Sequence, residues 1–377
     1  MIKTIEAGRI SELDGLRGIA IILVLIWHYY VSQINLSAHN MHGLFTHALM
    51  LSWSGVDLFF VLSGFLIGGK ILDNRDSSNF YSVFYARRAC RIFPIYFLWI
   101  GLFYSARFLH AQDPFPWLFD HPLPLLSYLT YTQNFVAAVN GSFGANWLGI
   151  TWTLAIEEQF YLLFPLVIRF FPKKHLSALL LSLIAFAPVI RTTLYFLLSS
   201  KGFVGHVLLP GRWDALLLGV FIAHLLRKPD AVKTIINNLP KITTCTYLSL
   251  AGIAALILFE VKATSLGMTI IGYTLLSVFY TLTLVTVVFN QNSLIAHVCK
   301  LKFLQFMGLI SYGVYLYHQG VAGLLHGMIL EQYPIITNLA DAIITILALV
   351  ITLIFAAISY LFLEQKIIVW GHNYKYK

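Results

Sequence analysis

Long apolar stretches alternate with short polar segments along almost all of the 377 residues. A helix of about 20 residues is long enough to cross the ~30 Å hydrocarbon core of a bilayer. The pattern predicts ten such helices, at residues 15–34, 49–70, 92–110, 148–170, 176–198, 208–226, 245–261, 267–289, 308–330 and 338–363. A weaker apolar stretch at 123–139 predicts a short, half-buried element in a long loop. We therefore expect an all-α, polytopic membrane protein.

Composition and charge support this fold class and predict its orientation. Hydrophobic residues make up 59% of the chain and charged residues 11%, whereas a soluble domain carries about 25% charged residues. With a cytoplasmic N-terminus, 20 of the 25 lysines and arginines fall on the cytoplasmic side, as the positive-inside rule requires. Both termini are then cytoplasmic. The net charge of +9 reflects topology and anionic lipid rather than nucleic acid. We expect one transmembrane domain over 1–377, with no fused soluble domain.

The first predicted span carries two ionisable residues, which are costly in lipid and usually face the protein interior. Arg17 and His28 are eleven residues apart, which is about three helical turns or roughly 16–17 Å, so they share one face. Asp14 precedes Arg17 by three residues, a spacing at which an ion pair would orient the arginine. This arrangement suggests a polar path that leads to a base. A snorkelling arginine and a histidine bonded to a neighbouring helix are the structural alternatives.

Three arginines, Arg87, Arg88 and Arg91, precede the third span on its cytoplasmic side. Spacings of three and four residues would cluster them on a helix. Guanidinium groups bind phosphate through paired hydrogen bonds, so the cluster is a candidate phosphate site. Ordinary positive-inside charge is the alternative explanation.

Two adjacent carboxylates, Glu157 and Glu158, lie inside the fourth span. Successive helical residues point about 100° apart, so the two side chains need different partners. We expect one to support catalysis and the other to anchor an ion pair. Glu158 is the one we favour for catalysis, because it shares a helical face with Arg169.

Other polar residues in or between the spans give weaker signals. Asp57 lies inside the second span, and an intramembrane carboxylate is a functional candidate by default. Arg212 and Asp214 open the sixth span, as a local ion pair or a site, and His318 lies in the ninth. The outer loop contains His39, His42 and His47, whose spacing could recruit zinc. Because no carboxylate or cysteine is near, we favour a polar loop and expect no metal.

Taken together, these segments resemble the acyltransferase 3 family of integral-membrane acyltransferases. The matching blocks are 14–17 with His28, 55–67, 88–94 and 152–161, with looser similarity at 212–219 and 308–318. The resemblance implies a ten-helix protein that moves an acyl group, often acetyl, from cytoplasmic acyl-coenzyme A to a sugar or glycan hydroxyl. It also implies that His28 is the catalytic histidine, Arg17 its paired arginine, and Arg88 and Arg91 the cytoplasmic pair, with Arg87 adjacent.

These residue types suit that chemistry. The arginine cluster can hold the phosphates of coenzyme A, and a neutral His28 can take the proton of the acceptor hydroxyl. Arg17 or backbone N–H groups would stabilise the oxyanion, and Glu157 or Glu158 would fix the histidine tautomer. Whether an acyl-enzyme intermediate forms stays open.

The expected protein is thus an O-acetyltransferase of the bacterial cytoplasmic (inner) membrane. Its partners would be acyl-coenzyme A, a carbohydrate or glycolipid acceptor and membrane lipid, without nucleic acid or metal. The oligomeric state, a homodimer included, stays open. A glycolipid transporter or flippase that uses the same buried charges is the main alternative, and a zinc enzyme built on the outer histidines is the other.

Overall fold

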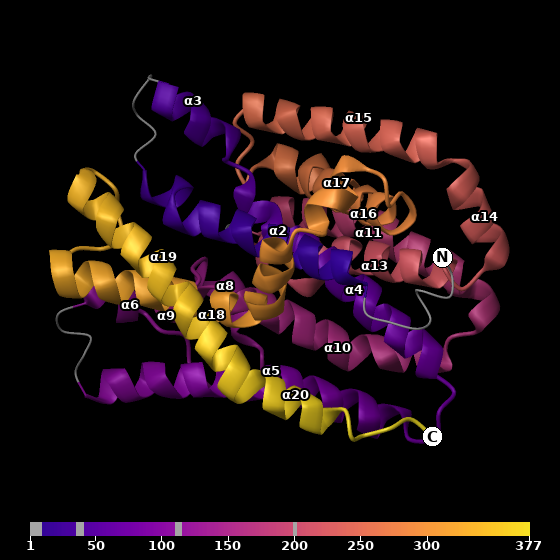
Figure 1. Cartoon of the computed structure of the whole chain (residues 1–377), viewed down its shortest axis with the longest axis horizontal. Coiled ribbons are helices and arrows are strands. Elements are labelled where there is room, and N and C mark those ends of the chain that lie inside the picture. The colour runs from indigo at the N-terminus through magenta and orange to yellow at the C-terminus, as the bar shows by residue number, and fades with distance from the viewer. Residues whose placement is uncertain (1–9, 35–40, 110–114, 199–201) are drawn as a thin grey trace.

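A computed structural model describes residues 10–34, 41–109, 115–198 and 202–377, and every regular element in these ranges is a helix (Figure 1). The long helices are α2 (Ser11–Tyr29), α4 (Gly55–Asn74), α5 (Phe80–Phe108), α10 (Trp152–Phe170), α11 (Leu176–Leu197), α13 (Leu209–Leu225), α15 (Leu239–Leu258), α16 (Tyr273–Phe289), α18 (Lys302–Leu330) and α19 (Leu339–Ser359). Shorter helices connect them: α3 (Met41–Ala48), α6 (Pro116–Phe119), α7 (Leu125–Leu129), α8 (Gln133–Asn140), α9 (Asn146–Gly149), α12 (Phe203–Val207), α14 (Pro229–Asn237), α17 (Leu294–Cys299) and α20 (Gln365–Gly371).

All ten predicted spans coincide with these long helices, in the same order. By length and apolar character, seven helices of the described chain can cross a membrane, or eight if the bent pair α13 and α14 counts as one span. The predicted spans beyond the seven fall on α10, α13 and α18, which are shorter or richer in polar side chains. The all-helical fold is therefore confirmed, and the count of ten stays a prediction.

Element boundaries differ most at α5. This helix begins at Phe80, twelve residues before the predicted start of the third span, and it contains Arg87, Arg88 and Arg91. Arginine is a good helix former, so a charged segment continues the helix that the apolar residues begin. The weak stretch at 123–139 forms the two short helices α7 and α8.

Helices α2 and α18 pack with their backbones in direct contact. A Cβ atom built on Gly18 would lie 2.0 Å from the carbonyl oxygen of Leu304, and one on Gly308 would lie 1.8 Å from that of Asp14. Only glycine permits this approach, as in other tightly packed membrane helices. Contacts at Arg17 and His28 follow the same order along α18, so the two helices run parallel.

Two buried ion pairs join the helices around α13. Arg212 donates to Asp57 of α4 over 2.7 Å, and Arg191 of α11 donates to Asp214 over 2.8 Å. All four side chains are at most 2% exposed. The sequence left open a local pair between Arg212 and Asp214, but each of them pairs with another helix. Asp57 is therefore matched by an arginine rather than exposed in a cavity.

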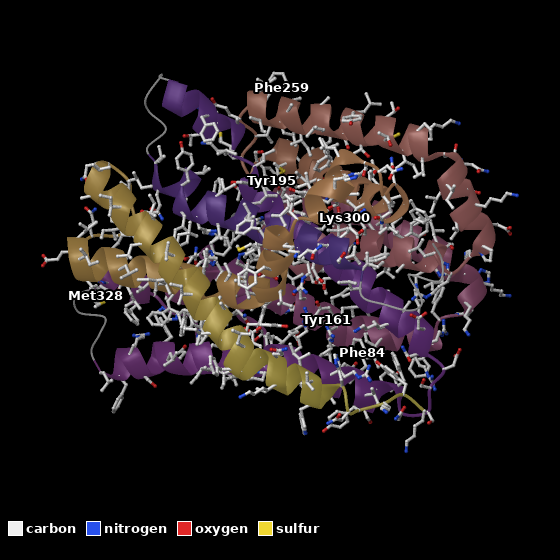
Figure 2. The ribbon with its side chains drawn as sticks, viewed as in Figure 1. Phe84, Tyr161, Tyr195, Phe259, Lys300 and Met328 are labelled. Atoms are coloured by element: carbon white, nitrogen blue, oxygen red, sulfur yellow. The ribbon has the colours of Figure 1, made fainter. Side chains whose placement is uncertain are left out.

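The outer surface of the bundle is strongly apolar. Phe259 is 80% exposed and Met328 is 67% exposed, and both lie at the periphery in Figure 2. Tyr161, in contrast, is buried in the interior. An exposed apolar surface of this extent is typical of lipid-facing helices rather than of a soluble domain.

We expect Gly308→Ala to destabilise the protein, because its new methyl group would overlap the Asp14 carbonyl of α2. Overpacking of this kind costs about 1–3 kcal/mol, so the melting temperature in detergent should fall by several degrees. Gly101→Ala in α5 is the matched control, since a Cβ there meets no atom within 4 Å. Equal melting temperatures for the two variants would contradict the close packing of α2 and α18.

Candidate active site

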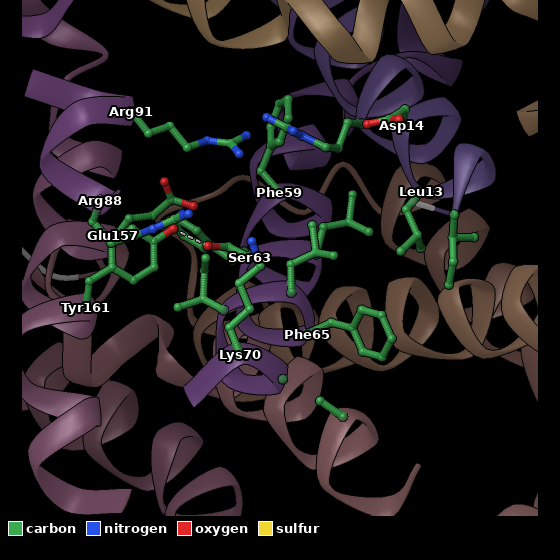
Figure 3. A pocket seen from close by; sticks show the side chains of 18 of the residues that line it. Leu13, Asp14, Phe59, Ser63, Phe65, Lys70, Arg88, Arg91, Glu157 and Tyr161 are labelled. Carbon is green, nitrogen blue, oxygen red and sulfur yellow. Dashed lines mark hydrogen bonds between the residues drawn. The ribbon is translucent and has the colours of Figure 1, made fainter. Parts of the chain in front are cut away.

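A cavity of about 1170 Å³ lies between α2, α4, α5, α10 and α18 (Figure 3). It opens where α4 ends and α5 begins, beside the C-terminal segment, because Lys70, Asp73 and Arg87 line it there together with Tyr376. By the predicted topology this end faces the cytoplasm. The cavity brings together residues from both ends of the sequence, so only the folded bundle creates it.

Cations outnumber carboxylates on the cavity wall. The cations are Arg17, Lys70, Arg87, Arg88, Arg91 and Arg227, and the carboxylates are Asp14, Asp73, Glu157 and Glu364. With histidine neutral, the wall carries a surplus of two positive charges. A partly enclosed basic surface of this kind attracts an anionic ligand.

The three arginines of α5 differ in the contacts of their guanidinium groups. Arg87 donates its Nε–H to the carbonyl of Tyr374 over 2.9 Å and lies 5.1 Å from the ring centre of Tyr376. Within the described chain, Arg88 and Arg91 have neither a hydrogen-bonded partner nor an ion pair, and Figure 3 shows them extending from α5 into the cavity. Their guanidinium groups are thus available to a bound anion.

Arg17 reaches the deeper part of the cavity from α2. Its Nη2 donates to Ser311 Oγ of α18 over 3.3 Å, and Ser311 Oγ donates to the Gly308 carbonyl over 2.8 Å. Sequence reasoning did not single out Ser311, although it lies in the block at 308–318. It also missed Glu364, which follows the predicted end of the tenth span by one residue and lies in the π-helical turn Tyr360–Glu364.

The two adjacent glutamates of α10 face different spaces, as their angular separation predicts. Glu157 lines the large cavity near Arg88 and Arg91. Glu158 lines a separate cavity of about 240 Å³ on the other side of Arg88 and Tyr161, and its buried Oε1 has no hydrogen bond within the described part of the chain. The geometry therefore brings Glu157, rather than Glu158, to the basic cavity.

His28 lies beyond the inner end of this cavity and is not part of its wall. Thr153, Tyr315 and Phe59 line the cavity, and the Tyr315 ring lies 5.9 Å from the ring of His318, which contacts His28; we call these three residues the inner wall. The Tyr315 hydroxyl and Thr153 Oγ1 form a hydrogen bond of 2.7 Å, and the ring centres of Tyr315 and Phe59 are 6.2 Å apart. The cavity that Arg17 lines therefore does not include His28, to which the sequence predicts a polar path.

The ring of His28 is oriented by its own helix. Nδ1 lies 3.0 Å from the Val24 carbonyl oxygen, and since a carbonyl only accepts, Nδ1 carries the hydrogen and a neutral ring leaves Nε2 as an acceptor. Gln33 Nε2 donates to the His28 carbonyl over 2.8 Å. The backbone of Val24 therefore holds the tautomer, a role that sequence reasoning gave to Glu157 or Glu158.

The histidines of the outer loop give no metal site that can be described. His39 lies outside the described residues, and the side chain of His42 is not described either. His47 Nδ1 lies 3.9 Å from Glu260 Oε1. Across the described chain, no three histidine, cysteine, aspartate or glutamate side chains gather closely enough to hold a metal ion.

An apolar outer surface around a basic internal cavity defines a multi-pass membrane protein with a polar site between its helices. Residues 10–361 match the family model described as an acyltransferase domain, and the chain therefore belongs to the acyltransferase 3 family. This confirms the family expected from the sequence.

Named relatives are similar over nearly the whole chain. The O-acetyltransferase OatA of Staphylococcus aureus strain COL is 28% identical over 371 residues, which cover 94% of this chain and 56% of the relative. A putative O-acetyltransferase of strain MSSA476 is also 28% identical, over 373 residues that cover 93% and 56%. The chain thus spans little more than half the length of these curated relatives. No solved structure matches it.

The cavity geometry predicts which positions a water-soluble thiol reagent can reach. In a background where Cys90, Cys245 and Cys299 are alanine, we expect Ser63→Cys to react with an impermeant methanethiosulfonate in inside-out vesicles. Ser63 lines the open cavity, whereas His28→Cys lies behind the inner wall and should react several times more slowly from that side. Labelling can be followed by mass spectrometry, and equal rates at the two positions would mean that the cavity continues to His28.

Proposed function

We propose that this protein is an integral-membrane O-acetyltransferase that moves an acetyl group from cytoplasmic acyl-coenzyme A to a hydroxyl of a sugar or glycan. The observation that carries the proposal is the pair Arg88 and Arg91, which have no partner among the described residues and line a basic cavity whose inner end lies toward His28. Family membership and similarity to proteins named O-acetyltransferases support the same reaction.

The cavity suits the donor in size and charge. Ligand pockets for drug-sized molecules measure about 300–1,000 Å³, so a cavity of about 1170 Å³ can hold a molecule as large as acetyl-coenzyme A. Arg88 and Arg91 would bind its phosphates through charge-assisted hydrogen bonds. The thioester end would then extend past Arg17 toward the inner wall.

His28 would act as the general base behind that wall. Its Nε2 takes the proton of the acceptor hydroxyl as the oxygen attacks the thioester carbon. The carbon–sulfur bond breaks, and the departing thiolate takes the proton back from His28. For the thioester to reach this point, Tyr315 has to leave its hydrogen bond to Thr153.

Arg17 is better suited to hold the donor than to contact the reacting carbonyl. It lies about three helical turns, roughly 16–17 Å, from His28 along α2, and its guanidinium already contacts Ser311 inside the cavity. Glu157 lies on the same cavity wall and would orient the basic groups around the donor. Asp14 would act with Arg17 from the neighbouring turn of α2.

The packing of α2 against α18 agrees with the membrane orientation that this reaction needs. We propose ten membrane spans with both termini in the cytoplasm of a bacterium, across its cytoplasmic membrane. α2 and α18 would be the first and ninth spans, which must cross in the same direction, and their parallel packing supports this order. The cavity then opens on the side where acyl-coenzyme A is made.

The proposal is tested with purified protein in lipid nanodiscs and acetyl-coenzyme A labelled in the acetyl group. We expect release of the free thiol, and in cells we expect acetylated surface glycans that disappear when the gene is deleted. A protein that alters glycolipid distribution across vesicles but releases no thiol would instead be a flippase, and the proposal would be wrong.

We expect His28→Ala to lower turnover of acetyl-coenzyme A by roughly 10²–10⁴-fold, the usual contribution of a general base. The melting temperature should stay within a few degrees of the wild type, because the hydrogen bond of the His28 ring, from Nδ1 to Val24, stays within its own helix. His297→Ala, an exposed histidine in α17 that likewise bonds to the preceding turn, is the control. Retention of more than about a tenth of wild-type turnover by His28→Ala would exclude this role.

We expect Arg88→Ala and Arg91→Ala each to raise the KM for acetyl-coenzyme A roughly 10- to 100-fold, the effect of losing a hydrogen bond to a charged group. The value of kcat at saturating donor should change little. Arg87→Ala should have a smaller effect, because Tyr374 already occupies this guanidinium. Lys173→Ala is the matched control, since Lys173 pairs with Asp76 outside the cavity. Unchanged donor KM in both variants would leave the cluster with a topological role only.

A further inference from the structure

A buried histidine lies directly against the partly buried His28. His318 of α18 is completely buried, and the ring centres of the two histidines are 4.7 Å apart with the planes inclined at 65°. The two residues are 290 positions apart in the sequence, so their contact depends on the packing of α2 against α18.

Both neutral histidine rings are held as the same tautomer, with the hydrogen on Nδ1. His318 Nδ1 lies 2.6 Å from the Tyr315 carbonyl oxygen, as His28 Nδ1 lies 3.0 Å from that of Val24. Each Nδ1 therefore donates to a carbonyl, and each neutral ring keeps a bare Nε2. His318 Nε2 is buried and has no hydrogen-bond partner among the residues that the structure describes. A buried acceptor without a donor is destabilising, so it calls for an explanation.

Among the described residues, carboxylates are not placed to stabilise a protonated His28. In hydrolase triads an acid orients the catalytic histidine and stabilises the imidazolium that forms. Across the described residues, neither His28 nor His318 has an ion pair with an acid. Glu157 and Glu158 face other spaces, so the positive charge that appears on His28 during proton transfer has to be stabilised by neutral groups.

We propose that His318 stabilises the protonated form of His28 and so supports its work as the base. The His318 ring, whose Nε2 carries a lone pair, is a fixed dipole in contact with the His28 ring, in an interior where electrostatic interactions are stronger than in water. When His28 takes the hydroxyl proton, this dipole lowers the energy of the charged ring, and the proton passes on to the thiolate. His318 is thus a positioning residue, and this inference rests on the proposed function.

The surrounding contacts fix His318 where this role needs it. The Tyr29 hydroxyl donates to the His318 carbonyl over 2.9 Å and lies 2.8 Å from Thr352 Oγ1 of α19. Tyr29 follows His28 on α2, so the helix that carries the base also holds the backbone of its partner. The ring of His318 is thereby kept against the ring of His28.

The test is a double-mutant cycle on thiol release from acetyl-coenzyme A by the purified protein in nanodiscs. His318→Phe keeps a ring but removes the acceptor, and we expect kcat to fall roughly 10- to 100-fold, with the donor KM unchanged. His318→Gln restores an acceptor oxygen and should recover part of this loss. Added to His28→Ala, His318→Phe should cause no further loss, because a residue that acts through His28 has nothing left to act on.

His206→Phe is the control, since His206 is also a buried histidine, which packs among aromatic rings and loses a hydrogen bond to the Tyr273 hydroxyl when it is replaced. Additive losses in the cycle, or equal losses in His318→Phe and His318→Gln, would overturn the inference. If His318→Phe does not fold, the cycle is run with His318→Gln, whose smaller loss must also vanish in the absence of His28. A wild-type protein that releases no thiol would instead refute the proposed function itself.

Discussion

Backbone contact between α2 and α18 determines where the polar groups of the interior meet. Lipid tails are as apolar as leucine, so helices in a membrane associate through close packing rather than the hydrophobic effect. Gly18 and Gly308 provide that packing because each faces a carbonyl of the opposite helix. The same contact brings Arg17 to Ser311 and His28 to His318. A larger side chain at either glycine would separate both pairs at once.

Paired and unpaired buried charges serve different purposes in this bundle. Asp57 and Arg212 satisfy each other at 2.7 Å, and breaking such a pair leaves an uncompensated charge in the interior. Arg88 and Arg91 have no partner of this kind among the described residues, although they line a cavity between helices. The rule that intramembrane charges mark functional sites therefore needs the tertiary structure, because only the structure tells which charges are already neutralised by the protein.

The sequence predicts the helices well because membrane-spanning length is a local property. It also predicts the arginine cluster of α5, since spacings of three and four residues require nothing but a helix. The choice between Glu157 and Glu158 depends on how α10 is rotated against α5, and no local pattern contains that rotation. Glu364 was missed because it follows the last apolar run. The contact of His28 with His318 joins two segments that lie far apart in the sequence, and no pattern within either segment predicts it.

The inner wall has a consequence for the energetics of the cell. A continuous aqueous path through the bundle would let ions flow down the membrane potential, which is worth about 2.3 kcal/mol per charge per 100 mV. Tyr315, Thr153 and Phe59 are joined at the inner end of the cavity by a hydrogen bond and aromatic packing, and in the proposed reaction they would interrupt such a path. In the proposed reaction, the polyanionic coenzyme A stays on the cytoplasmic side. Only the small, uncharged acetyl group passes the inner wall, because it is transferred from one covalent bond to another. The acetyl group would then cross the membrane without a flow of ions.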